Sequence, residues 1–426
     1  MAQLGEESIW RYSFRALKFR NYRLFFAGQS LSLIGTWMTT VASSWLMYRL
    51  THSALLLGIA GFTSQIPMLL VGPFAGVWVD RLNRHRVLVV TQALSMLQSF
   101  ALATLALTHE ITAEHVLALN LFQGIVNAFD MPARQAFLPQ MVERREDLPN
   151  AIALNSMMVN GSRLVGPSLA GFIIAAFGEA YCFLIDGISY SAVILSLLAM
   201  HISPPRTNRV KESMGTELRQ GWRYVAGFAP ARNILLLLGL VSLVGMPYTV
   251  LMPVFASRSL GGGAHTLGLL MAAQGLGAVA SAIWLASRKS VLGLVRIIPF
   301  VAMLFGVAVV AFGFSRSLPL SLVLLFVSGF GMMQQMSASN TILQTITEED
   351  KRGRLMSYYA IAFQGTMPFG SLLAGWSASR YGPSTTLAVG GTCCVLGAIG
   401  FLLRIDDVRR VLRPIYVQLG ILPRRK

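Results

Sequence analysis

Long apolar runs dominate this sequence and constrain its fold more than any other feature. Twelve windows of 18 to 28 residues are predominantly apolar. The hydrocarbon core of a bilayer needs roughly 20 apolar residues per helix, and within it only helices or closed barrels satisfy every backbone polar group. The sequence therefore predicts an all-α polytopic membrane protein with 12 transmembrane helices. The predicted spans are approximately 22–49, 54–79, 86–108, 115–132, 149–176, 181–201, 232–256, 266–287, 293–314, 319–343, 355–379 and 384–404.

The charged residues support this interpretation and give it an orientation. Only 12% of residues are charged and 54% are hydrophobic, which excludes an ordinary water-soluble globule. Of the 35 Lys and Arg residues, four lie at predicted outer span ends or loops and one, Arg163, lies deep in a span, which leaves 30 at the inner side. The positive-inside rule then predicts a multi-pass membrane protein with both termini in the cytoplasm. The net charge of +17 is thereby explained as an orientation signal, and no nucleic-acid partner is expected.

The longest polar stretch divides the predicted spans six and six. A weak repeat links the halves: Gly124 matches Gly329 at an offset of 205, and Gly171 matches Gly375 at an offset of 204. The order of these matches predicts two pseudo-symmetric six-helix bundles around a central cavity. The expected parts are a basic amphipathic segment on the inner membrane surface (1–20), an N-terminal bundle (21–202), a cytoplasmic linker (203–230), a C-terminal bundle (231–404) and a basic cytoplasmic tail (405–426).

The segment "GPFAGVWVDRLNRHR" (72–86) combines one small residue with one acid and several cations. Gly76 would let two helices approach closely, and Asp80 could cap a helix or pair with an arginine. This pattern, with Arg81 and Arg84, resembles the signature loop of the major facilitator superfamily, "GxxxDRxGRR". The resemblance implies that these residues govern an inner gate. The plainer alternative is a stop-transfer charge cluster.

The fifth span carries "NGSRLVGPSLAG" (160–171). Gly166, Pro167 and Gly171 resemble the Gly-Pro signature of the exporter branch of the same superfamily. The resemblance implies that this helix seals the cavity against inward leak. The alternative is a generic small-residue face for helix packing.

A narrower resemblance covers residues 19–200 well and the second half loosely. "FRNYRLFFAGQSLSLIGTWM" and "AFDMPARQAFLPQMV" resemble bacterial exporters of the enterobactin-exporter type, the transmembrane secretion effectors. This resemblance implies efflux of a small organic solute, a drug-like compound or siderophore, by alternating access and usually driven by protons. Asn120 stands where many proton-coupled relatives have an arginine, and the first span contains no acid.

Each ionisable residue inside a predicted span requires a structural or functional explanation, because inserting a charged group at bilayer depth costs about 3 kcal/mol. Asp130 is the candidate for proton coupling. The alternative is an ion pair at the inner end with Arg134, which could join Asp80 in one gate network. Arg163 is the candidate for binding an anionic solute, with pairing to Asp130 as the alternative. Asp186 is expected to cap the sixth span near the outer surface.

Amide, hydroxyl and aromatic side chains gather on the spans that would line the cavity. Amides offer both donors and acceptors, which suits a bulky amphipathic solute. Each of these residues alone is as well explained by helix packing. The expected solute-binding set is Gln29, Trp37, Asn127, Asn155, Ser156, Asn160, Arg163, Gln334, Gln335, Asn340, Tyr359 and Gln364.

Motifs of other function classes are missing from the sequence. It contains no phosphate-binding loop, no catalytic constellation and no metal-spaced histidine or cysteine set, so no cofactor, metal or enzymatic activity is expected. The expected partners are a small-molecule solute, protons as the coupling ion and membrane lipids, and the chain is expected to act as a monomer. Two alternatives stay open: a transporter or flippase for lysophospholipid or a similar amphiphile, and a membrane receptor or scaffold without transport.

Overall fold

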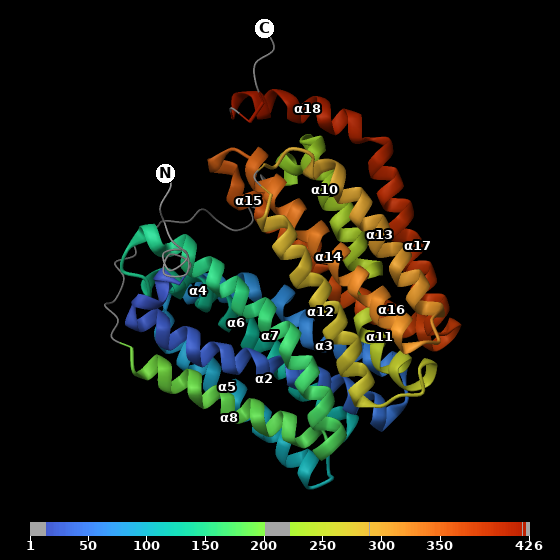
Figure 1. The fold of residues 1–426 in the computed structure, drawn as a ribbon. Coiled ribbons are helices and arrows are strands. Elements are labelled where there is room, and N and C mark those ends of the chain that lie inside the picture. Colours follow the sequence, from blue (N-terminus) through green and yellow to red (C-terminus); the bar gives the residue numbers. More distant parts are fainter. Residues whose placement is uncertain (1–13, 201–221, 289, 420, 423–426) are drawn as a thin grey trace, which may run out of the picture. The chain divides into compact units, whose positions relative to one another are not determined.

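The fold is described by a computed structural model for residues 14–200, 222–288, 290–419 and 421–422. Regular secondary structure in these residues is helical throughout, with no strand (Figure 1). Residues 1–13 and 201–221, and with them most of the predicted amphipathic N-terminal segment and linker, lie outside the described residues.

The described residues of the first half of the chain form seven α-helices. α3 and α4 together make one span that bends by 47° where they meet at Val71. Pro67 inside α3 and a proline in the first turn of α4 each remove a backbone donor, which explains the bend at this point. The helices are α2 (Arg20–Thr51), α3 (Ala54–Leu70), α4 (Gly72–Arg81), α5 (Arg84–Leu107), α6 (Ala113–Phe137), α7 (Leu148–Phe177) and α8 (Glu179–Leu198).

Two spans in the second half are interrupted by π-helical turns. One turn, Val241–Gly245, connects α10 to α11, and another, Ile361–Gly365, connects α15 to α16. Each turn is followed within three residues by a proline, which cannot continue an α-helical hydrogen-bond ladder. The helices are α10 (Ala229–Leu240), α11 (Tyr248–Val254), α12 (Ala264–Ala286), α13 (Leu294–Phe314), α14 (Leu318–Ile346), α15 (Glu349–Ala360), α16 (Met367–Tyr381), α17 (Pro383–Leu403) and α18 (Ile405–Gln418).

All twelve predicted windows fall on a helix or a broken helix, with edges within a few residues. Seven helices in the described part of the chain are long and apolar enough to cross a membrane, and the bent α3–α4 pair makes eight. α6 and α7 fall short of that hydropathy because they carry polar residues such as Asn127, Asn160 and Arg163.

The packing divides the chain into two compact units. Unit 1 comprises residues 1–51, 63–207 and 263–272, and unit 2 comprises 52–62, 208–262 and 273–426. In unit 1, α5 packs against α8 and α6. In unit 2, the corresponding helix α13 packs against α17 and α14. The same partners in both halves agree with the internal repeat.

Both described ends of the chain dock onto the helices. Arg15–Lys18 form a 3₁₀ turn in which Ala16 is fully buried, and Arg15 Nε lies 2.7 Å from Asp147 Oδ1. At the other end, α18 buries Val408 and Leu412 and contacts α10, α13, α14 and α17. The apolar face of α18 therefore covers unit 2, while Arg409, Arg410 and Arg413 stay exposed.

Candidate functional site

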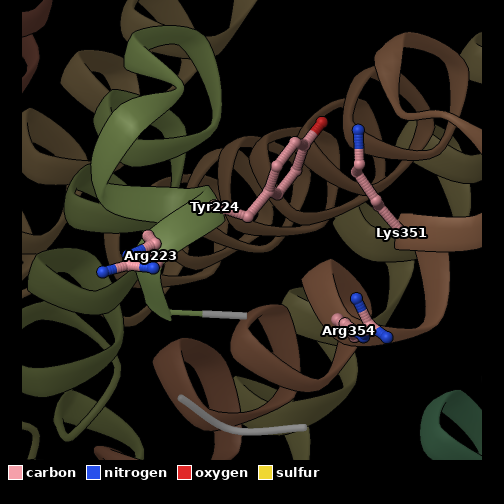
Figure 2. A pocket seen from close by; sticks show the side chains of 4 residues that line it. All are labelled: Arg223, Tyr224, Lys351 and Arg354. Carbon is pink, nitrogen blue, oxygen red and sulfur yellow. The ribbon is translucent and has the colours of Figure 1, made fainter. Parts of the chain in front are cut away.

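A basic cavity of about 270 Å³ lies in unit 2 beside α15. It is lined by Arg223 and Tyr224, from the helical residues 222–227, and by Lys351 and Arg354 from α15 (Figure 2). Lys351 Nζ lies 5.6 Å from the centroid of the Tyr224 ring, a cation–π distance. Sequence reasoning missed this cavity because its two walls are about 130 residues apart in the chain. The available signal was the charged run "EEDKRGR", which contains three acids and three cations.

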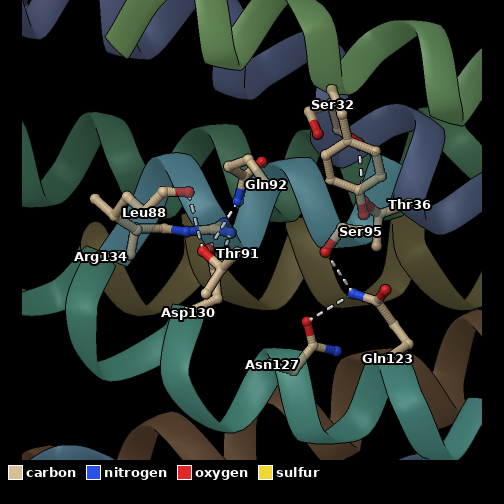
Figure 3. A network of polar contacts seen from close by, with 11 residues as sticks. Ser32, Thr36, Leu88, Thr91, Gln92, Ser95, Gln123, Asn127, Asp130 and Arg134 are labelled. Atoms are coloured by element: carbon tan, nitrogen blue, oxygen red, sulfur yellow. Dashed lines mark hydrogen bonds and ion pairs between the residues drawn. The ribbon is translucent and has the colours of Figure 1, made fainter. Parts of the chain in front are cut away.

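Asp130 in α6 is buried and fully satisfied within unit 1. Its Oδ1 accepts hydrogen bonds from Thr91 Oγ1 at 2.8 Å and from Gln92 Nε2 at 2.7 Å, both on α5. Its Oδ2 accepts from Arg134, one turn later on α6 (Figure 3). Two neutral donors and one cation are the environment of an ionised carboxylate. The ion pair with Arg134 that the sequence offered as an alternative is present.

The Asp130 cluster continues along α5 and α6. Gln123 Nε2 donates to Ser95 Oγ at 3.0 Å and to Asn127 Oδ1 at 3.1 Å (Figure 3). Asn127, one of the predicted solute ligands, has an exposed side chain. The α5–α6 pair thus presents amides at its surface and holds its carboxylate inside.

The predicted gate loop lies at the end of unit 1 where α4 meets α5; we call this the basic end and the opposite one the far end. Arg84 Nη1 donates to the Ala136 carbonyl oxygen in the last turn of α6, at 3.4 Å. Arg81 is exposed, and the Asp80 side chain is outside the described atoms. The close approach expected at Gly76 is not present, because a Cβ on this residue would meet nothing within 4 Å.

The fifth span packs tightly at the glycines of its signature. A Cβ on Gly166 would lie 2.5 Å from Trp37 Cβ in α2. One on Gly171 would lie 2.9 Å from the Gly268 Cα in the first turns of α12. Pro167 lies between them inside α7, and its carbonyl oxygen would be 2.8 Å from a Cβ on Gly268. The small-residue face of α7 is therefore a site of direct helix contact.

Arg163 and Trp37 form a cation–π pair in unit 1. The Arg163 Cζ lies 5.5 Å from the centroid of the Trp37 ring, and both side chains are half-buried. On the same stripe of α7, Asn160 Nδ2 donates to the Ser156 carbonyl oxygen at 2.8 Å. Among the described ion pairs, the carboxylate of Asp130 pairs with Arg134 and not with Arg163.

The solute ligands predicted in the second half lie on α14 and α15–α16. Gln334 and Gln335 are buried, and Ser281 Oγ donates to Gln334 Oε1 at 2.8 Å. Neither Nε2 has an acceptor among the described residues. Tyr359 donates to the Met336 carbonyl oxygen at 3.1 Å. Of the remaining predicted ligands, Asn155 and Asn340 are half-buried, Ser156 and Gln364 are exposed, and Gln29 is buried.

The prediction for Asp186 was wrong. α8 begins at Glu179, which pairs with Arg49 at 2.9 Å, so Asp186 lies two turns inside the helix and caps nothing. Its side chain is 1% exposed and accepts hydrogen bonds from Thr39 and Ser99. The sequence contained one unused signal, a polar stripe with helical spacing on α5: Thr91, Gln92, Ser95, Gln98 and Ser99.

Comparison with known proteins identifies the family. The family model described as "transmembrane secretion effector" matches residues 12–411. The staphyloferrin A transporter of Staphylococcus aureus is 25% identical, with 90% of this chain and 96% of the relative aligned. The multidrug efflux pump Tap of Mycolicibacterium fortuitum is 27% identical (89% and 95%), and the enterobactin exporter of Salmonella typhi is 24% identical (91% and 93%).

Solved structures show the same fold. A bacterial homologue of the human lysosomal transporter Spinster is 15% identical and aligns over 94% of this chain and 98% of its own, with a TM-score of 0.65. The nucleoside transporter NupG is 14% identical (91% and 98%), with a TM-score of 0.64. These relatives are transporters rather than enzymes. The chain belongs to the transmembrane secretion effector family of major facilitator superfamily transporters.

Proposed function

We propose that this protein exports a small organic solute, a siderophore or a drug-like compound, across the bacterial inner membrane by alternating access. The observation that carries the proposal is the match to siderophore and multidrug transporters, which extends over 89% to 91% of the chain. The half-buried Arg163–Trp37 pair supports the same conclusion, because it offers a cation and an aromatic face inside a span. A carboxylate or catecholate solute would bind to both.

The stripe on α7 would complete the solute site. The hydroxyl of Ser156 and the amide of Asn160 lie about two turns and one turn before Arg163, on the same face. Guanidinium binds a planar anion through two parallel hydrogen bonds, which fixes its orientation. The neighbouring hydroxyl and amide would then discriminate among solutes by hydrogen bonding.

Gating is assigned to the two ends of unit 1. At the basic end, Asp130, Arg134 and Arg84 tie α5 and α6 together, with Gly76, Asp80 and Arg81 in the adjoining loop. Toward the far end, in the second half of α7, the residues Gly166, Pro167 and Gly171 would form the seal. Charged contacts can exchange partners at low cost, whereas glycine contacts require close backbone packing, so the two ends would open by different means.

Proton coupling is assigned to Asp130. Protonation of this carboxylate would remove its charge attraction to Arg134 and weaken the hydrogen bonds from Thr91 and Gln92. The α5–α6 contact at the basic end would then loosen, which couples proton binding to gate opening.

The basic cavity of unit 2 is assigned to membrane lipid. Its three cations and one aromatic hydroxyl suit a phosphate group, and an anionic phospholipid headgroup is available where the positive-inside rule places this segment, at the cytoplasmic surface.

Both termini of the chain would lie on the cytoplasmic side as well. A fluorescent protein fused after Lys426 should then fluoresce in the cell, and an alkaline phosphatase fused there should be inactive.

A gene deletion with a metabolite comparison tests the solute proposal. The deletion strain should retain one siderophore or gain sensitivity to a class of drugs, and the wild-type gene should reverse the change. A strain altered only in its lysophospholipid distribution would support the flippase alternative. Solute binding by purified protein with no flux in liposomes would support the receptor alternative instead.

A further inference from the structure

Asp186 is a buried acid without a counter-charge. Its side chain is 1% exposed and lies between α8, α2 and α5. Thr39 Oγ1 on α2 and Ser99 Oγ on α5 each donate to its Oδ2 at 2.9 Å. Its Oδ1 has no hydrogen-bond partner among the described residues. Asp186 forms no ion pair within the described part of the chain.

Among the described residues of the helices that pack around Asp186, no cation pairs with it. α8 packs against α2, α5 and α7. Arg49 on α2 is engaged by Glu179, Arg163 on α7 stacks on Trp37, and the buried stripe of α5 carries no charge. On α8 itself the facing groups are Cys182 and Tyr190.

Three acids are buried among the described residues of unit 1, and Asp130 and Asp186 differ in kind; the third, Glu179, is paired with Arg49. Asp130 receives two neutral donors and an arginine, whereas Asp186 is surrounded by hydroxyls alone: Thr39 and Ser99 donate to its Oδ2, and Ser189 donates to its backbone carbonyl oxygen. An isolated carboxylate inside a protein is far more costly than a carboxylic acid, which removes the charge at the expense of holding one proton. The surroundings of Asp186 therefore favour a neutral carboxylic acid, whereas Asp130 has an arginine that balances the charge of a carboxylate.

A buried polar stripe on α5 connects these acids. Thr91 and Gln92 bind Asp130 at one end, and Ser99 binds Asp186 at the other. Thr91 and Ser99 are eight residues apart, which is about 12 Å along a helix. Between them lie Ser95 and Gln98, both 3% exposed. Hydroxyl and amide groups of this kind are the partners that buried water molecules use.

We propose that Asp186 is a second proton-binding residue of the transport cycle, connected to Asp130 by the polar stripe of α5. The proton leaves the Asp186 carboxyl group, passes along the hydroxyls and the water they hold, and binds the Asp130 carboxylate as its ion pair with Arg134 opens. One carboxylate is formed and one is neutralised, so the charge inside unit 1 does not change. This role rests on the proposed proton-coupled export, but the protonation of Asp186 can be measured without transport.

The test is infrared difference spectroscopy of the purified, lipid-reconstituted protein, titrated across neutral pH. The wild type should show a carboxylic acid carbonyl band that persists at neutral pH. Asp186→Asn should remove this band, while Asp130→Asn and the matched control Glu179→Gln, an ion-paired acid on the same helix, should retain it. Ser99→Ala keeps the acid and removes one donor, so it should shift the band; this variant also covers a failure of Asp186→Asn to fold.

The outcomes separate this inference from the proposed function. A band that survives in Asp186→Asn, or no band in the wild type at neutral pH, overturns the assignment of Asp186. A band that behaves as expected, with solute transport that moves no protons in the wild type, overturns proton coupling and with it the role of Asp186 in the cycle. Proton movement that is present in the wild type and lost in Asp186→Asn, with solute affinity retained, supports the full proposal.

Discussion

Gly171 on α7 and Gly268 on α12 meet backbone to backbone. A Cβ on Gly171 would lie 2.9 Å from the Gly268 Cα, and one on Gly268 would lie 2.8 Å from the Gly171 Cα. The repeat partner of Gly171, Gly375, makes the same kind of contact with Gly58, at 2.7 Å. Two glycines matched by sequence repeat thus have equivalent structural roles, one in each unit.

Gly171→Ala should destabilise the protein, because the added methyl group cannot fit unless α7 and α12 move apart. Overpacking of this kind costs about 1–3 kcal/mol. The measurement is the midpoint of thermal unfolding in detergent, which should fall by several degrees. Gly161→Ala is the matched control on the same helix, since its Cβ would meet nothing within 4 Å. An equal effect of the two variants would contradict the packing argument.

Arg163→Ala should weaken binding of an anionic solute at least tenfold, because the guanidinium is the cation that we assign to the solute. Arg163→Lys should recover part of the affinity, since the charge returns without the planar fork. The affinity of Trp37→Phe should lie between those of the wild type and Arg163→Ala, because phenylalanine keeps an aromatic face that attracts a cation less strongly. Titration calorimetry with purified protein measures each affinity. Arg258→Ala, a cation outside the proposed site, is the control, and wild-type affinity in Arg163→Ala would remove this residue from the site.

Asp130→Asn should uncouple proton movement from solute movement, because the amide can neither bind nor release a proton near neutral pH. Solute binding should persist, since Asp130 lies among Thr91, Gln92 and Arg134 rather than beside Arg163. A pH-sensitive dye inside proteoliposomes records the proton flux that accompanies the solute. A proton flux in Asp130→Asn equal to that of the wild type would show that another residue couples protons to the solute.

Arg354→Gln and Arg223→Gln should reduce the stabilisation of the protein by anionic lipid. Each variant removes one of the three cations of the unit 2 cavity. We expect nanodiscs with phosphatidylglycerol to raise the unfolding temperature of the wild type above its value in phosphatidylcholine, and the variants to lose most of this difference. Arg380→Gln, a cation in a predicted outer loop, is the control. The same stabilisation by inorganic phosphate in phosphatidylcholine would identify free phosphate as the ligand, and no difference between the two lipids would reject the lipid assignment.

The sequence was sufficient for the helices and for much of the packing. The lengths of the apolar runs located every span, and the internal repeat predicted that Gly171 and Gly375 occupy equivalent positions in the two halves. The Asp130–Arg134 pair was one of the two interpretations that the sequence offered for Asp130, and the structure contains it. These features depend on local or repeated patterns, which a single sequence contains.

Features that depend on tertiary packing were missed. Asp186 was expected to cap a helix because hydropathy does not fix where a helix begins, and α8 starts seven residues earlier at Glu179. Gly76 fits a signature loop but has no neighbour at contact distance in this structure. The burial of Gln29, Gln334 and Gln335 depends on the helices beside them, so sequence alone could not separate them from exposed residues such as Gln364.

The most direct test of the account is solute uptake into inside-out membrane vesicles that carry the protein. With a proton gradient imposed, the account predicts accumulation of the siderophore or drug above its external concentration, abolished by a protonophore and by Arg163→Ala. Solute movement that only equalises the two concentrations, at the same rate with and without the gradient, would contradict coupled export.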